Sequence, residues 1–182
     1  MTQGQLTKKQ KALVRELENI FSLLGLDFRD IQRYERESRT TRLELAKKHV
    51  IRAEVIIQYT LIDENLSNIL CDYFFGKKKS YIQLWKTRKF QNFNHHVLQE
   101  LSVLKKLAFV KSIVGVPNTI VRDIERVNSL RNGLAHAFFP ENLRRSKPEY
   151  KGKNIFTLDG ITSLLNDTSR IHDFFFKKLY RV

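Results

Sequence analysis

A chain of 182 residues with seven glycines and three prolines is long enough for one domain with a sizeable core and has few helix-breaking residues. Its formal net charge of +14 favours a polyanionic partner, RNA or DNA, over an anionic membrane. No apolar run approaches the length of about 18 residues that spans a bilayer. Long patterns with a helical period predict an all-α fold, an antiparallel bundle of four to five helices.

The first 40 residues read as a helical lead-in to the bundle. Residues 6–24 have leucines and isoleucines at helical spacing, whereas residues 26–38 are dense in charge. We therefore expect a lead-in over residues 1–40 and a helical bundle over residues 41–182, forming one globular domain overall. The N-terminus lacks the apolar core of a signal peptide, and the single cysteine, Cys71, lies in an apolar helix. Both observations favour a reducing, cytoplasmic location.

The longest helical pattern covers residues 41–75. Thr41 and Glu44 have the spacing of a capping box, and Gly76 stands where the C′ residue of the helix is expected. Glu54 falls on the apolar face of this helix, whereas Asp63 points away from it and is expected in solvent. The residues predicted to share the apolar face are Leu43, Val50, Ile57, Leu61, Leu66, Ile69 and Tyr73.

Residues 77–92 connect two long helices and alternate basic with aromatic side chains. The basic residues are Lys77, Lys78, Lys79, Lys86, Arg88 and Lys89, and the aromatic ones are Tyr81, Trp85 and Phe90. Basic side chains bind phosphates without reading sequence, and exposed aromatic rings stack on unpaired bases. The basic residues are thus candidate RNA contacts. The aromatic residues have two interpretations, since they can equally plug the connector onto the core.

A third helix is predicted from about residue 93 to residue 114, with Val97, Leu101, Leu104 and Ala108 facing inward. His95 and His96 are adjacent, so on a helix they point about 100° apart, and nothing nearby completes a metal shell. No metal and no cofactor are expected. The isolated histidines, His49 and His172, need no special role.

The next helix, residues 118–139, carries a cation on its buried face. Asn118 or Thr119 is the expected N-cap and Pro140 the stop. Arg131 lies near the middle of the apolar stripe, where a guanidinium is costly unless it has a partner. Glu54 is a natural partner, although it can also lie at the rim of the bundle in water. The stripe consists of Ile120, Ile124, Val127, Leu134 and Phe138.

A basic loop follows, and then a last helix. The loop carries Arg144 and Arg145, further candidates for RNA contact, and a small hairpin is predicted within residues 145–156. Thr157 is the expected cap of a helix over residues 158–179. Its inward residues are predicted to be Ile161, Leu164, Leu165, Ile171, Phe174, Phe175 and Leu179.

The segment from Arg131 to His136, RNGLAH, resembles the signature of the HEPN superfamily, an arginine and a polar residue followed by a histidine. The spacing alone recurs at Arg88/His95 and Arg42/His49. Only Arg131 is followed directly by an uncharged polar residue, Asn132, and lies on an apolar stripe late in a long helix. The similarity extends over most of residues 40–180. It implies an all-helical domain and a metal-independent endoribonuclease, typically a toxin or an antiphage-defence effector.

The chemistry of these residues suits RNA, which carries its own nucleophile. A histidine can act as general acid or base on the 2′-OH without a metal, and a fixed arginine can stabilise the charge of the transition state. We therefore expect His136 and Arg131 to be catalytic, with Asn132 beside them and Glu54 as the partner of Arg131. The products would be a 2′,3′-cyclic phosphate and a 5′-OH, and DNA would be inert.

The resemblance also implies partners. Active members are homodimers in which two motif helices meet across a cleft. Where one branch of the family has a tyrosine that is silenced by AMP transfer, this chain has Phe138, so that regulation is not expected. A protein antitoxin, a sensor partner or neither stays open. The alternative function is a non-catalytic HEPN-like module that binds RNA or a partner protein.

Overall fold

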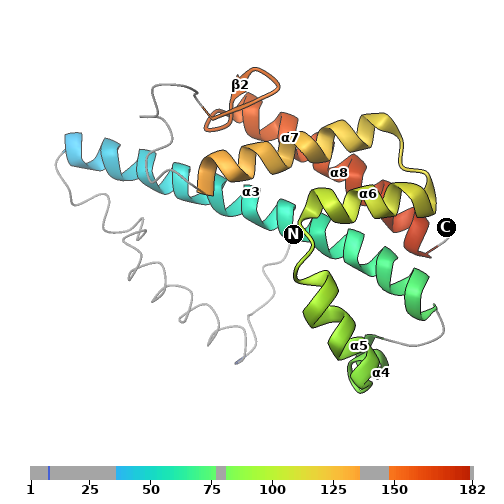
Figure 1. Cartoon of the computed structure of the whole chain (residues 1–182). Coiled ribbons are helices and arrows are strands. Elements are labelled where there is room, and N and C mark those ends of the chain that lie inside the picture. The colour runs from blue at the N-terminus through green and yellow to red at the C-terminus, as the bar shows by residue number, and fades with distance from the viewer. Residues whose placement is uncertain (1–7, 9–35, 77–80, 136–147, 181–182) are drawn as a thin grey trace. The chain divides into compact units, whose positions relative to one another are not determined.

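The computed structural model describes Lys8 and residues 36–76, 81–135 and 148–180 (Figure 1). The chain divides into two units, residues 1–50 and residues 51–182. The prediction of an all-α bundle is confirmed, because the described elements are helices apart from one small hairpin. The expected boundary near residue 40 stays a prediction.

Helix α3 spans Arg36–Phe75, and its ends test two expectations. The capping box is wrong, since Thr41 and Glu44 lie within the helix, whose described part already begins at Arg36. The C-terminal glycine is confirmed, because Gly76 has a φ of 76° and its N–H donates to the Asp72 carbonyl at 3.0 Å. A residue without a Cβ adopts this left-handed conformation at little cost, which ends the helix.

The predicted inner face of α3 is partly wrong. Leu66 and Ile69 are buried, but Val50, Ile57, Leu61 and Tyr73 are 40–64% exposed. The side chains that enter the core are Ile51, Val55, Ile62, Leu66, Ile69, Leu70 and Cys71. Because apolar residues surround much of this long helix, the sequence offers two overlapping stripes, and packing against the other helices selects between them.

The third helix is not continuous. The connector holds α4 (Tyr81–Trp85) and α5 (Arg88–Phe93), which leads into the π-helical turn η1 (Asn94–Leu98); α6 (Val103–Val114) follows a break. Ser102 caps α6 from an extended conformation, and its hydroxyl accepts from the Lys105 N–H at 3.4 Å. α6 therefore begins after the break with its own cap, and the face that it buries differs from the predicted one. Val97, Leu104 and Ala108 are exposed, while Val103, Lys106, Leu107 and Val110 are buried.

Helix α7 spans Asn118–Ala135 and matches its predicted stripe. The side chains of Ile120, Ile124, Val127 and Leu134 are buried as expected, and Phe138 lies outside the described residues. The Val121 N–H bonds to the Pro117 carbonyl at 3.1 Å, so the first helical hydrogen bond starts one residue before the predicted caps. The predicted stop at Pro140 also falls outside the described part.

A two-stranded hairpin and α8 complete the chain. Strands β1 (Glu149–Tyr150) and β2 (Lys153–Asn154) pair antiparallel, so the predicted hairpin is confirmed. Its two-residue turn has positive φ at Lys151 (51°) and Gly152 (74°), the conformation of a type I′ turn. Helix α8 spans Leu158–Tyr180 and is capped as predicted, since the Thr157 hydroxyl accepts from the Gly160 N–H at 3.2 Å.

Gly160 lets α8 approach the hairpin closely. A Cβ at this position would lie 2.1 Å from the carbonyl oxygen of Asn154, a clash with backbone that no side-chain movement relieves. The inward side of α8 follows its predicted stripe except for Leu165, which is 39% exposed. The hairpin is therefore held against the start of α8 by backbone contact.

Within residues 51–182, α7 runs opposite to α3, α6 and α8 (Figure 1). One core joins these helices and the hairpin, from Ile51 and Val55 through Phe90 to Phe175. The return from α3 to α6 through α4, α5 and η1 lets two helices that follow each other share a direction. Among the described helices, none is long and apolar enough to cross a membrane.

Candidate functional site

Helix α7 places Arg131 at the surface of the core with its charge not neutralised by a carboxylate. Its side chain is half-buried, and the guanidinium carbon lies 4.9 Å from the ring centroid of Tyr59 on α3. Its Nη1 donates to the Oδ1 of Asn132 at 3.1 Å. No carboxylate of the described residues forms an ion pair with it. Arg131 thus keeps a full charge beside an aromatic ring.

The predicted pairing of Glu54 with Arg131 is wrong for the described chain. The Glu54 carboxylate accepts a hydrogen bond from Gln58 Nε2 at 2.7 Å and forms no ion pair with Arg131 in the part of the chain that the structure describes. The reason is helical geometry. Tyr59 follows Glu54 by five residues, which places the two side chains about 140° apart around α3. A guanidinium that faces Tyr59 therefore cannot also face Glu54.

Other predicted site residues fall outside the described part of the chain. They are His136, Lys77, Lys78, Lys79, Arg144 and Arg145. Lys86, Arg88 and Lys89 are described and exposed on α4–α5 and the turn between them. Lys89 Nζ lies 5.6 Å from the Phe75 ring centroid. The aromatic residues of the connector differ in burial, because Phe90 is fully buried and Trp85 is 45% exposed.

His172, expected to be isolated, belongs to a polar chain between α3 and α8. Its Nδ1 is 3.0 Å from Asn65 Nδ2, and its Nε2 is 2.9 Å from Gln58 Oε1. With the two amides oriented in this way, a neutral ring that accepts at Nδ1 and donates at Nε2 satisfies both contacts. Burial lowers the pKa of His172, with Asp173 opposing that shift. Gln58 and Asn65 are seven residues apart on α3, a spacing that could have signalled a shared polar face.

We expect His172 to make the folded protein less stable in mild acid. Because the pKa of folded His172 lies below its unfolded value of about 6.5, the unfolded state binds more protons once the pH falls through that value. The contribution of His172 to the free energy of unfolding is therefore fully present above this pH and is lost as the pH drops below it. Urea unfolding of wild type and His172→Gln between pH 7.5 and 5 measures the effect. An identical pH dependence of the two proteins would contradict it.

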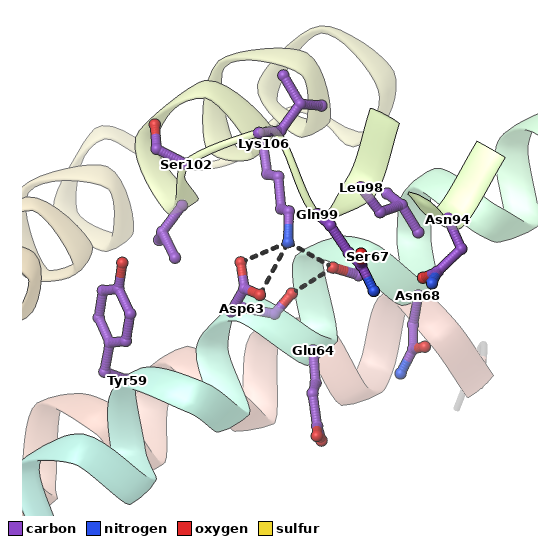
Figure 2. A pocket seen from close by; sticks show the side chains of 12 residues that line it. Tyr59, Asp63, Glu64, Ser67, Asn68, Asn94, Leu98, Gln99, Ser102 and Lys106 are labelled. Carbon is purple, nitrogen blue, oxygen red and sulfur yellow. Dashed lines mark hydrogen bonds and ion pairs between the residues drawn. The ribbon is translucent and has the colours of Figure 1, made fainter. Parts of the chain in front are cut away.

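A second polar site, which we call the Lys106 cavity, lies between α3 and the η1–α6 segment (Figure 2). Lys106 is 4% exposed, and its ammonium donates to Asp63 Oδ1 at 2.7 Å, to Asp63 Oδ2 at 2.8 Å and to Ser67 Oγ at 3.0 Å. Asp63 was expected in solvent and instead holds this cation. The cavity has a volume of about 600 Å³.

Two buried carboxylates join α7 to α8. Asp123 and Asp167 are each 3% exposed. Arg170 pairs with both, at 2.9 Å to Asp123 Oδ2 and more closely to Asp167. Arg126 pairs with Asp123 at 2.9 Å, and Lys151 of the hairpin turn pairs with both. Buried charges require partners of this kind, so the cluster locks the hairpin and two helices together.

Tyr150 is the buried neighbour of this cluster. Its hydroxyl donates to Asp167 Oδ2 at 2.9 Å. Burial raises the pKa of Tyr150, and the hydrogen bond to Asp167 raises it further, so the phenol stays neutral. Beside it, a groove of about 420 Å³ runs along α7 and is lined by Arg122, Arg126, Ser129, Gly133, Tyr150 and Lys151 among others. The sequence signal for the cluster is Asp123, a carboxylate on the inner face of α7.

Among the residues that the structure describes, no group of three or more His, Cys, Asp or Glu side chains could hold a metal ion. Comparison with family models, with curated proteins and with solved structures gives no match to this chain.

Proposed function

We propose that the protein is a metal-independent endoribonuclease of the HEPN type, acting as a toxin or antiphage-defence effector. The observation that carries the proposal is Arg131. A half-buried guanidinium that lies over the Tyr59 ring, donates to Asn132 and lacks a carboxylate partner among the described residues supports the proposal, because such a group can bind an anion. In RNA cleavage, this anion would be the phosphate in its phosphorane-like transition state, whose extra charge an arginine can stabilise.

In the proposed reaction, His136 removes the proton of the 2′-OH, which attacks the adjacent phosphorus, and the bond to the 5′-oxygen breaks. The leaving 5′-oxygen takes up a proton, from water or from a second histidine. Arg131 stabilises the charge on the phosphate oxygens. On the helix that the sequence predicts over residues 118–139, residues five positions apart point about 140° from each other. A homodimer in which each copy supplies one of the two groups satisfies that geometry, and it forms part of the proposal.

The test is cleavage of RNA by the purified full chain. Total RNA or a labelled single strand should be cut in the presence of EDTA, with 2′,3′-cyclic phosphate ends. A strand with a 2′-deoxy sugar at the scissile position should survive. Loss of activity in EDTA, or equal cutting of the deoxy strand, would refute the mechanism. A wild type that binds RNA and cuts none would favour the non-catalytic binding module.

RNA affinity should depend on the basic connector. Reversing the charges of Lys86, Arg88 and Lys89 to glutamate should weaken binding and flatten the plot of log affinity against log salt by about one unit for each lost phosphate contact. Reversal of Lys77–Lys79 and of Arg144/Arg145 should add to the loss. Lys177→Glu, an exposed change on α8, is the control. An unchanged salt slope after all reversals would place the RNA elsewhere.

A further inference from the structure

The Lys106 cavity has the wrong charge for a phosphate. Of the residues that line it, all within the described part of the chain, Lys106 is the only cation. Its three donors are used by Asp63 and Ser67, so its charge is already neutralised. Glu64 adds a further negative charge to the lining. Although the chain has a net charge of +14, the Lys106 cavity offers no free positive charge. It therefore favours a ligand group that is neutral.

The lining is instead rich in amides that can both donate and accept. Asn68, Asn94 and Gln99 lie together on one side of the Lys106–Asp63 pair, with Tyr59 on the other side (Figure 2). The side chains of Asn68 and Asn94 form no hydrogen bond with any other residue in the described ranges, whereas Gln99 Oε1 lies 3.3 Å from His95 Nδ1. Each free amide offers an acceptor and two donors. This combination matches the edges of nucleobases, which side-chain amides read through paired hydrogen bonds.

Two further observations support a ligand site. One wall comes from the π-helical turn η1, which contributes Asn94 and Leu98; such turns are rare and occur frequently at functional sites. The volume of about 600 Å³ lies in the range of small-molecule sites. At the other end of the cavity, the ring of Tyr59 forms the cation–π contact with Arg131. Tyr59 therefore contacts both the cavity and the proposed catalytic arginine.

We propose that the Lys106 cavity receives the base of one unpaired nucleotide of the RNA strand and gives the protein its base preference. This rests on the proposed function, because it assigns a base site to the same RNA. Asn68, Asn94 and Gln99 read the edge of the base, and the Lys106–Asp63 pair holds α6 against α3 so that the amides keep their spacing. The shared chemistry, a nucleobase, also exists in free nucleosides, and the experiment separates the two sources.

The experiment measures binding of the full chain to single-stranded RNA hexamers by fluorescence anisotropy. The hexamers carry 2′-O-methyl groups so that they are not cut, and they comprise the four homopolymers and one abasic strand. Wild type should prefer one base over the abasic strand. Asn68→Ala and Asn94→Ala should each weaken that preference by about tenfold, the discrimination expected of a paired hydrogen bond. Asn166→Ala, an exposed amide on α8, is the matched control.

The salt dependence should be the same in wild type and in the cavity variants, because the amides contact no phosphate. Asn68→Trp, which fills the cavity, should abolish the base preference and leave the abasic strand bound equally well. Cavity variants that bind all hexamers like wild type would overturn this inference alone, provided that wild type cleaves RNA. Free nucleosides that bind as tightly as the preferred hexamer would overturn the assignment to an RNA strand. Absence of both RNA binding and cleavage would overturn the proposed function as well.

Discussion

Replacing either His136 or Arg131 by alanine should reduce RNA cleavage to background while RNA binding persists. A general acid or base contributes about 10²–10⁴-fold to rate, and one donor that stabilises transition-state charge contributes about 10²–10³-fold. Either loss alone should therefore silence the protein in cells. The measurement is the initial cleavage rate of a labelled RNA in EDTA, together with growth of bacteria that express each variant.

The two variants need different controls. His49→Ala removes an exposed histidine with a similar arginine spacing and should leave cleavage unchanged. Arg131 is stacked on Tyr59, so Arg131→Ala requires a thermal melt to separate misfolding from lost chemistry. Arg131→Lys keeps the charge and loses the planar fork, and it should retain only a small part of the rate. A folded Arg131→Ala protein that cuts RNA at the wild-type rate would end the proposed mechanism.

Asp63→Ala should destabilise the protein by about 3–5 kcal/mol, because it leaves the buried ammonium of Lys106 without a counter-charge. The loss of stability should lie near the lower end of this range, because Ser67 and the adjoining cavity still partly solvate the Lys106 ammonium. Urea unfolding monitored by circular dichroism measures the loss. Glu100→Ala, which removes an exposed carboxylate, should change the stability by less than about 1 kcal/mol.

A double variant distinguishes a stranded charge from simple loss of packing. Lys106→Met removes the cation and keeps an apolar chain of similar length, so Asp63→Ala combined with Lys106→Met should recover much of the stability that Asp63→Ala alone loses. If the two single losses simply add in the double variant, the carboxylate does not act through Lys106. The ion pair would then be one more solvated contact between α3 and α6.

Local patterns in the sequence were sufficient for features that depend on neighbouring residues. The helical repeat of α7 identified four of its buried residues, and Thr157 and Gly76 marked helix ends, because caps satisfy backbone groups only a few positions away. The hairpin near residue 150 follows from the same kind of short-range signal. Arg131 was also identified as a cation on an apolar stripe. Its half-buried place on α7 agrees with that interpretation.

The tertiary structure decided which side of each helix faces which neighbour. On α3, apolar residues occupy more than one stripe, so the rotation that buries Val55 and Ile62 depends on the other helices. The same rotation places Tyr59, rather than Glu54, against Arg131, and pairs Asp63 with Lys106 across 43 residues of sequence. Periodicity measures only relative angles within one helix. The absolute rotation, and with it every partner of a buried charge, is set when the helices pack.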